Sequence, residues 1–507
     1  MKNKTMLFGL PLIMFLLIVV NLSNVYAGKN NSVTIVLVEQ PDIVDPCEAT
    51  RSNVGKIIKQ NVIETLVEIN PADGSIKPRL ATSWKQIDDL TWQFELRKNV
   101  EFHDGESFNA KTAIKAIKRN LNPKSDCEVR TKYFGSMTLS VSPVGSHSIK
   151  VKTKKPQPIM PALMGTMTIS SPKTQPLKGE RNPSGTGPYV FKKWVPGQKV
   201  VLSRFSDYWG NKPEVEEATY IWRSESAVRA AMVKTGEADI APNIAVQDAT
   251  EPTMDFSFFN SETSRLRMDP TREPFYDWRV RLAANLAIDI EGMKGTIFSP
   301  DVVPMTQIVV PSINGHNHNL RQWGYDPAEA KRLLEAAKKD GIHVDKEITL
   351  VGRIGIYPNE VEAMEAMQMM LSEVGFNVKL KMMETSQWLD FLSKPYAEDR
   401  GPILIQAQHD NNNGDAVFSM IFKYHCSGAQ STTCDKAIDE GIEAATVATG
   451  NERRRLWQEV QRRLHEDIIP DVQMYHMVGY ARVNPRIDFT PTISTNSEVQ
   501  LAQIKIR

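Results

Sequence analysis

The chain has 507 residues, 61 of them basic and 60 acidic, and its formal net charge at pH 7 is +1. Because positive and negative charges nearly cancel, the protein has no strong electrostatic field. This argues against nucleic acid or an anionic membrane surface as a partner and favours a small neutral or zwitterionic molecule. A chain this long exceeds the usual size of a single hydrophobic core, so we expect two or three domains.

Residues 1 to 27 have the pattern of a secretory signal peptide. Lys2 and Lys4 precede an apolar run over residues 6 to 20, and Val25 and Ala27 occupy the two positions that a signal peptidase reads. We therefore expect export with cleavage after Ala27; an uncleaved membrane anchor is the alternative. Because Gly28, and no cysteine, comes directly after the cleavage site, we do not expect a lipid-anchored lipoprotein.

The stretch from residue 263 to residue 290 predicts a strand that turns sharply into a buried helix. Residues 263 to 269 alternate as in a half-buried strand, and the two sides hold Ser264, Leu266 and Met268 on the one hand and Thr263, Arg265, Arg267 and Asp269 on the other. Pro270 and Pro274 prevent its continuation. Asp277 can cap a helix whose apolar residues cover most of its circumference, so we expect that helix to be buried.

This stretch also carries a resemblance to a known family. Residues 274 to 289 read PFYDWRVRLAANLAID, which resembles the PFxDxRVRxAxxxAID of family 5 of the bacterial extracellular solute-binding proteins, the dipeptide-, oligopeptide- and nickel-binding receptors of ABC transporters. Further matches in chain order are PRLATSW from residue 78, TWQFELR from residue 91, VEFHDG from residue 100 and GTGPY from residue 185. The resemblance covers essentially the whole chain after residue 27.

The resemblance implies an α/β, two-lobed periplasmic-binding-protein fold of class II with an extra subdomain. It places the ligand cleft between the lobes and makes the hinge from two crossing strands. The implied domain ranges are 28–67, 183–268 and 481–507 for lobe I, 68–182 for the extra subdomain and 269–480 for lobe II.

A periplasmic receptor of this kind implies a small-molecule ligand and a membrane permease as partners, a monomer, no cofactor and no catalysis. The alternative from another class is a secreted hydrolase, which would need a nucleophile with a partner base or a trio of metal ligands. The chain has no Gly-x-Ser-x-Gly elbow, His103 lies in a turn, and His316 and His318 lack a third ligand. A metal-chelate or haem receptor is a further alternative within the binding proteins.

Two stretches supply the predicted ligand-binding residues. The family has an LDP turn where this chain reads VDP at residues 44 to 46, and the matching positions after it are Thr50, Arg51 and Ser52. A helical pattern follows over residues 54 to 66. Further along, an apolar strand from residue 403 runs into a polar loop, and in an α/β lobe ligands bind at such strand ends. That loop contributes Gln408, His409, Asp410, Asn411, Asn412 and Asp415.

The ligand itself is predicted to be a solute other than an ordinary peptide. Peptide receptors of this family hold the peptide's ammonium with an aspartate in a loop resembling WxGDxGD, and here Asn412 takes that position, although Asp410 lies two residues away. Arg51, Arg265 and Arg267 could face the cleft and bind a carboxylate. The alternatives are ion pairs of these arginines with Glu48, Glu262 or Asp269, and a di- or oligopeptide ligand.

The four cysteines allow three pairings in an exported chain. Cys426 and Cys434 flank a short turn-rich segment, so we expect them to form a local loop clamp. That leaves Cys47 to pair with Cys127.

Overall fold

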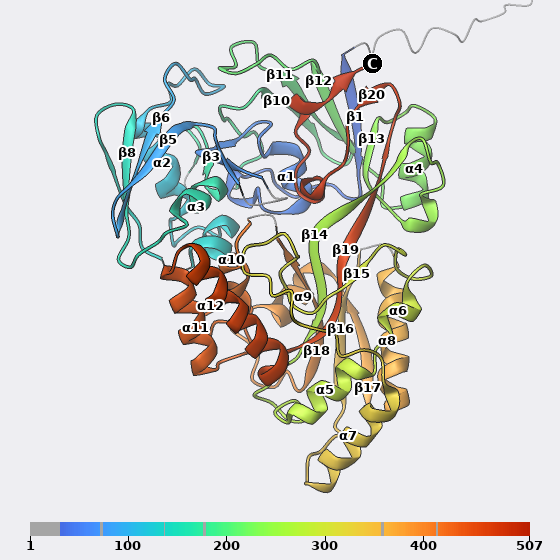
Figure 1. The fold of residues 1–507 in the computed structure, drawn as a ribbon. Helices are drawn as coiled ribbons and strands as arrows, with labels where there is room; N and C mark the ends of the chain where they lie inside the picture. Colours follow the sequence, from blue (N-terminus) through green and yellow to red (C-terminus); the bar gives the residue numbers. More distant parts are fainter. Residues whose placement is uncertain (1–30, 71–74, 136, 176–178, 356–358, 412–413) are drawn as a thin grey trace, which may run out of the picture.

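The computed structural model describes residues 31–507, apart from residues 71–74, 136, 176–178, 356–358 and 412–413 (Figure 1). The predicted signal peptide, residues 1–27, therefore lies outside the described residues. Within the described part of the chain, no helix has the length and apolar character that a membrane crossing requires.

One 11-stranded mixed sheet runs through both lobes in the order β10-β11-β12-β1-β13-β19-β14-β18-β16-β17, with β15 added beside β19. We call the end from β10 to β13, with its helices, lobe I. Its elements are β1 (Ser32–Leu37), β10 (Tyr189–Val195), β11 (Lys199–Arg204), β12 (Glu217–Trp222), β13 (Ile240–Ile244), α1 (Ser52–Ile58) and α4 (Ser226–Lys234). Short elements at the end of the chain complete it: η5 (Ile493–Asn496), η6 (Leu501–Gln503), β20 (Ile487–Asp488) and β21 (Lys505–Ile506).

Lobe II is the other end of the sheet, with helices on both of its faces. Its strands are β15 (Val303–Pro304), β16 (Ile348–Arg353), β17 (Val378–Met383) and β18 (Ile403–Asp410). Its helices are α5 (Trp278–Leu286), α6 (Ile290–Met293), α7 (Pro327–Lys339), α8 (Glu360–Val374), α9 (Thr385–Leu392), α10 (Val417–Lys423), α11 (Lys436–Val447), α12 (Gly450–Arg463) and η4 (Leu464–Ile468).

Two long strands join the lobes, as the resemblance implied. β14 (Asp255–Arg267) and β19 (Asp471–Val483) pair with each other along most of their length (Figure 1). The last part of β19 pairs with β13 of lobe I, and the last part of β14 pairs with β18 of lobe II. These two strands are the crossing hinge of the two-lobed fold.

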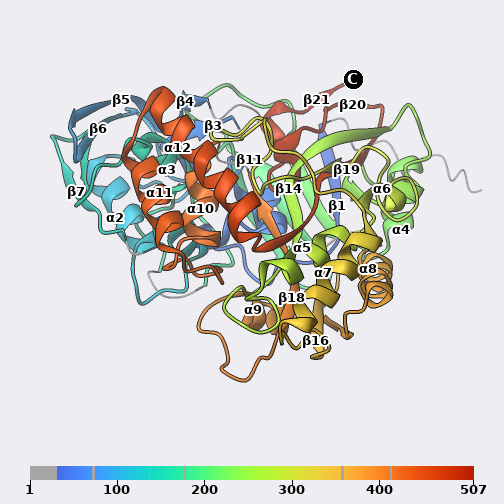
Figure 2. The ribbon, with the colours of Figure 1, turned by 60° about the horizontal axis from the view of Figure 1, so that its bottom comes forward.

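The subdomain inserted after α1 has its own four-stranded sheet, in the order β5-β6-β8-β7. Its elements are β5 (Ala81–Asp88), β6 (Thr91–Leu96), β7 (Ser140–Pro143), β8 (Ser148–Lys152), α2 (Ala110–Asn120), η2 (Arg130–Phe134) and α3 (Met160–Thr166), and short strands β2 (Glu64–Thr65), β3 (Val67–Ile69), β4 (Ile76–Pro78) and β9 (Thr168–Ile169) lie beside it. Figure 2 shows α10, α11 and α12 beside this subdomain. One continuous apolar core spans the two, and the rings of Tyr133 and Phe418 meet edge to face at 5.4 Å.

The strand and helix around residue 270 form as predicted, with one correction. Asp277 caps α5 by accepting from the backbone N–H of Arg279, and α5 is mostly buried. The prediction of a half-buried strand was wrong, because every residue of β14 from Thr263 to Arg267 is buried. Helices cover both faces of the sheet in lobe II, so the polar side of the alternation is internal instead of solvent-facing.

Candidate functional site

The carboxyl ends of the parallel strands of lobe II point toward lobe I. β18 runs parallel to β16 and ends where Asp410 pairs with Glu262 in the middle of the hinge strand β14. β16 therefore also points its carboxyl end, at Arg353, toward lobe I. In open α/β sheets, ligands bind outside the carboxyl ends of the strands, because loops and helix N-termini gather there. This boundary is our candidate site.

Arg353 is a half-buried cation at the end of β16 that forms no ion pair with a described carboxylate. Its Nε donates to Thr385 Oγ1 at 3.0 Å, and its guanidinium lies over the ring of Trp388, 5.3 Å from the ring centroid. Its backbone N–H donates to Gln406 Oε1 at 3.2 Å. These contacts hold the half-buried side chain in place, and no ion pair joins it to a described carboxylate.

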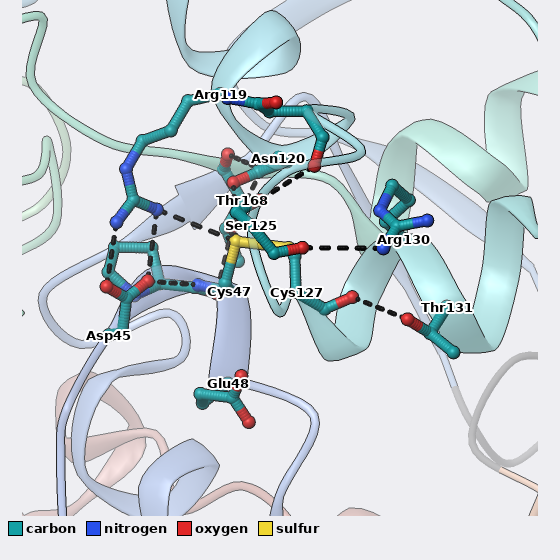
Figure 3. The surroundings of a disulfide bond; sticks show 12 residues. Asp45, Cys47, Glu48, Arg119, Asn120, Ser125, Cys127, Arg130, Thr131 and Thr168 are labelled. Atoms are coloured by element: carbon teal, nitrogen blue, oxygen red, sulfur yellow. Dashed lines mark hydrogen bonds and ion pairs between the residues drawn. A yellow bond between two sulfur atoms is a disulfide. The ribbon is translucent and has the colours of Figure 1, made fainter. Parts of the chain in front are cut away.

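On the lobe I side, the turn before α1 is fixed by a disulfide and an ion pair (Figure 3). Cys47, in η1 (Pro46–Glu48), is bonded to Cys127 of the subdomain. Arg119 of α2 makes two hydrogen bonds to Asp45, at 3.0 and 2.7 Å. The covalent link and the fork-shaped pair together set the direction in which the chain leaves η1 toward Thr50.

The three predicted residues after this turn lie at the start of α1. Ser52 Oγ donates to the backbone oxygen of Asn496 at 2.5 Å. Thr50 Oγ1 is buried and has no hydrogen-bond partner among the described residues. Arg51 is half exposed and pairs with Glu48 at 2.6 Å and with Glu128 at 3.0 Å. The predicted alternative of an ion pair with Glu48 is therefore confirmed for Arg51.

Glu48, at the end of η1, is a second buried acid beside this turn. Burial raises the pKa of its carboxyl to about 7, because the opposing attraction of Arg51 is smaller and Glu128 and Asp126 add repulsion. A carboxyl with such a pKa changes its charge near neutral pH. It could therefore donate or accept a hydrogen bond at the edge of the site.

Polar side chains also cross the lobe boundary or reach the hinge from lobe I. Gln247 and Asn359 exchange two side-chain hydrogen bonds, at 3.0 and 3.2 Å, between lobe I and the start of α8. Asn496 of η5 donates to Glu262 of β14 at 2.7 Å. Polar groups from both lobes thus meet around the strand ends.

Arg265 and Arg267, predicted to face the ligand, lie inside lobe II. Arg265 is fully buried, pairs with Asp471 and lies over Tyr424, with its guanidinium carbon 5.2 Å from the ring centroid. Arg267 donates to the backbone oxygens of Leu392, Gln430 and Phe391. Because both faces of this part of β14 are covered, the two guanidinium groups lie in the interior of lobe II. The alternative of an internal ion pair therefore holds for Arg265, with Asp471 as a partner that the sequence did not indicate.

Most of the predicted loop residues also make hydrogen bonds or ion pairs within the protein. His409 is buried and hydrogen-bonds Ser419 through Nε2. Asn411 donates to the backbone oxygen of Ser261 at 2.8 Å, and Asp415 binds Arg453 through both carboxylate oxygens at 2.9 and 2.7 Å.

Gln408 is the loop residue that stays closest to the prediction. It lies at the end of β18 opposite Ser264, and its Oε1 is buried without a described partner. Asn412 and the side chain of Asp410 lie outside the described residues.

The sequence interpretation missed Arg353, and a usable signal was present. Residues 348 to 351 were recognisable as a strand, and Arg353 comes two residues after them. The rule that ligands bind at strand carboxyl ends applies to this strand as well as to the one at residue 403. Glu262 and Asn496 could not be found in this way, because their meeting depends on the fold of the C-terminal segment against the hinge.

The histidine patterns behave as structural features. His103 Nε2 donates to the backbone oxygen of Gly187 at 2.9 Å, while its Nδ1 accepts from the N–H of Gly185 at 3.3 Å. Burial lowers its pKa to about 4, so the ring is neutral at pH 7. Within the described residues, no three His, Cys, Asp or Glu side chains are grouped to hold a metal ion.

Comparison with known proteins places this geometry in a family. The family of bacterial extracellular solute-binding proteins, family 5 (middle), matches residues 75–431. Di/tripeptide-binding protein 2 of Pseudomonas aeruginosa is 25% identical over 495 residues, which make up 88% of this chain and 91% of the relative. Heme-binding protein A of Haemophilus influenzae is 23% identical over 499 residues, 91% of this chain and 90% of the relative.

Solved structures share the fold. The periplasmic binding protein DppA of Helicobacter pylori, in complex with the peptide STSA, superposes with a TM-score of 0.81 at 21% identity, over 94% of this chain and 98% of that one. AgaA of A. tumefaciens R10, in complex with agropinic acid, gives a TM-score of 0.80 at 22% identity, over 94% and 99% of the two chains. With a family match over more than half of its length, this chain belongs to family 5 of the bacterial extracellular solute-binding proteins.

Proposed function

We propose that this protein binds a small organic solute through a carboxylate group, in the site between its lobes. As a family 5 protein it is a solute-binding protein of an ABC importer, and such proteins deliver their solute to a membrane permease. The chemical class of the solute, its position between the lobes and the residues that hold it are the proposal.

The observation that carries the proposal is Arg353. Arg353 lies at a strand carboxyl end that points toward lobe I, only Nε of its guanidinium is hydrogen-bonded to another described side chain, and no described carboxylate pairs with it. A guanidinium presents a planar fork of donors that matches the two oxygens of a carboxylate. Gln408 Oε1 and Thr50 Oγ1, both buried without described partners, supply polar groups on either side of the boundary.

The known relatives leave several ligand classes open, haem among them, and the sequence bears on the choice between a peptide and another acid. Relatives are named for di- and tripeptides, and one similar structure holds agropinic acid. The position that would neutralise a peptide's ammonium in the resembling loop is Asn412, and an amide cannot neutralise a cation. This favours a non-peptide acid over a peptide.

The remaining parts of the functional proposal follow from the sequence. We infer export with cleavage after Ala27, a periplasmic protein without a lipid anchor, and a monomer that performs no catalysis. The solute passes unchanged to the permease.

The experiment is a thermal-shift screen of di- and tripeptide mixtures beside a panel of small organic acids. Ligand at 100 times its dissociation constant stabilises the folded state by about 2.7 kcal/mol, which a melting curve resolves. The proposal predicts that an acid from the panel binds, that Arg353→Gln abolishes the shift, and that Arg332→Gln does not, because Arg332 is exposed on α7 and pairs with Glu329. Micromolar binding of unmodified peptides that Asp410→Asn abolishes and Arg353→Gln leaves intact would contradict it.

A further inference from the structure

The start of α8 carries a helix-capping signal that the structure does not use. Asn359 is the N-cap residue of α8, and Glu362 follows it three residues later, which is the sequence pattern of a capping box. An asparagine at an N-cap normally accepts a hydrogen bond from a backbone N–H of the first turn. The side chain of Asn359 makes no such bond to the first turn of α8.

The side chain of Asn359 reaches across the lobe boundary instead. Its Oδ1 accepts from Gln247 Nε2 at 3.0 Å, and its Nδ2 donates to Gln247 Oε1 at 3.2 Å and to the backbone oxygen of Ile297 at 3.0 Å. Gln247 lies in η3 (Val246–Asp248), directly after β13 of lobe I. Figure 1 shows α8 of lobe II below α4 of lobe I. The two amides therefore form a neutral contact of two hydrogen bonds between the lobes.

The backbone of Asn359 also departs from that of an ordinary N-cap. Its φ is +59° and its ψ is 23°, a left-handed conformation, whereas N-cap residues usually have extended backbones. Such a conformation costs free energy outside glycine and persists where surrounding contacts hold it. Here the contacts that hold it are the bonds to Gln247 and Ile297.

The segment that contains Ile297 makes a second contact beside the first. The hydroxyl of Tyr480 lies 2.8 Å from Ser299 Oγ and donates to Asp301 Oδ2 at 3.0 Å. Tyr480 belongs to the part of β19 that pairs with β13 of lobe I. Asn359 is therefore tied to a lobe II segment that itself rests on the lobe I end of the hinge.

We propose that Asn359 is a two-position switch between the lobes. With the lobes together, as in Figure 1, its side chain pairs with Gln247. When the lobes separate, its backbone returns to an extended conformation and its side chain caps α8. Two neutral hydrogen bonds at a partly exposed site and one helix cap contribute free energies of the same order, so neither position outweighs the other by far.

The switch lowers the cost of opening, because the amide of Asn359 exchanges one set of hydrogen bonds for another. It requires no particular solute. Its tests are therefore made without solute, and their failure would leave the proposal of a carboxylate-binding site as it stands.

Hydrogen exchange at the amides of Val361 and Glu362 tests the capping position, since these are the N–H groups that an N-cap side chain binds. In Gln247→Ala, Asn359 loses its partner in lobe I, and we expect exchange at these amides to slow at least threefold relative to the native protein. Asn359→Ser should slow it as well, because serine caps a helix but is too short to reach Gln247. The double variant Gln247→Ala with Asn359→Ala should lose the slowing.

Small-angle scattering of the same proteins without solute tests the position between the lobes. Gln247→Ala and Asn359→Ser should each have a larger radius of gyration than the native protein. Gln86→Ala, an exposed glutamine on β5 of the subdomain, should match the native protein in both measurements. Unchanged exchange in Gln247→Ala, or a radius of gyration equal to that of the native protein in both lobe-contact variants, would overturn the proposal.

Discussion

Three buried side chains form a hydrogen-bonded chain where the two hinge strands cross. Asn411 donates to Thr263 Oγ1 at 3.2 Å, and the Thr263 hydroxyl lies 2.8 Å from His476 Nδ1. If Thr263 uses its hydrogen toward the imidazole, Nδ1 is an acceptor and the ring is neutral. Burial, with a smaller repulsion from His316, lowers the pKa of His476 to about 3.

This neutral histidine makes the hinge sensitive to acid. The unfolded chain takes up a proton near the ordinary pKa of about 6.5, while the folded one does so only near 3, so the contribution of His476 to stability is present above pH 6.5 and is lost as the pH falls. We expect the free energy of unfolding to fall between pH 7 and pH 4 by up to about 3 kcal/mol from this residue.

Urea denaturation of His476→Asn at the two pH values tests this. The variant should be less stable at pH 7 but should lose less stability on acidification than the native protein. His343→Asn, at an exposed position after α7, should keep the native pH dependence. An equal loss in His476→Asn and the native protein would show that His476 is not the acid-sensitive group.

At the scale of the element, the part of β14 from Thr263 to Arg267 has its polar side buried as tightly as its apolar side. Arg265 is internal and its charge is balanced by Asp471 of the other hinge strand. Removing one member of a buried pair leaves the other charge uncompensated, which costs about 3 to 5 kcal/mol. We expect Arg265→Leu to lower the free energy of unfolding by this amount without changing ligand affinity in the molecules that fold.

Chemical denaturation and ligand titration of Arg265→Leu are the two measurements. The double variant Arg265→Leu with Asp471→Asn should recover part of the stability, because it removes the orphaned carboxylate. If the single variant instead lost ligand affinity and kept its stability, Arg265 would be a ligand-binding residue and the internal ion pair would not explain its role.

The loop after α10 is clamped by Cys426–Cys434, as the sequence predicted. Closing a short loop stabilises the folded state by roughly 2 to 3 kcal/mol in the chain-entropy account. Mild reduction should therefore make the peptide bonds between the two cysteines susceptible to protease before the whole protein unfolds. Proteolysis with mass spectrometry measures this, and simultaneous loss of all protection would contradict a local clamp. Protease cleavage near the Cys47–Cys127 bond, which joins η1 to the subdomain, is followed in the same experiment for comparison.

Elements were predictable from the sequence where local signals and long-range packing agree. The cap of α5 by Asp277 is a local signal and was found as predicted. The helical pattern over residues 54 to 66 was not: α1 ends at Ile58, because Gln60 takes a left-handed conformation. The alternation of polar and apolar residues in β14 was also misleading about burial. It shows which side of the strand is polar, but it cannot show that α9 and α10 cover that side.

The candidate site was less predictable than the fold. The loop after β18 was correctly identified as a strand end, yet His409, Asn411 and Asp415 bind protein groups from α10, β14 and α12. A polar run in a sequence does not tell which of its side chains are used internally. Arg353 was not predicted as a ligand-binding residue, because a single arginine after a strand does not form a recognisable sequence pattern.

At the scale of the whole molecule, the two-lobed fold with an extra subdomain was implied by the resemblance and is confirmed. One sheet crosses from lobe to lobe, and β14 and β19 are the strands that join its two halves. The domain ranges stay a prediction. Contacts such as the hydrogen bonds between Gln247 and Asn359 join the lobes away from the hinge. Such contacts can separate while the hinge strands stay paired, which is the geometry of hinge closure.

Small-angle X-ray scattering with and without the acid that gives the largest thermal shift tests this account most directly. A receptor that closes on its solute should show a smaller radius of gyration when saturated, with unchanged helix content by circular dichroism. Arg353→Gln at the same acid concentration should keep the larger radius of gyration, because without bound solute nothing stabilises the closed arrangement of the lobes. Identical scattering profiles for the empty and the saturated native protein would contradict closure on a solute held between the lobes.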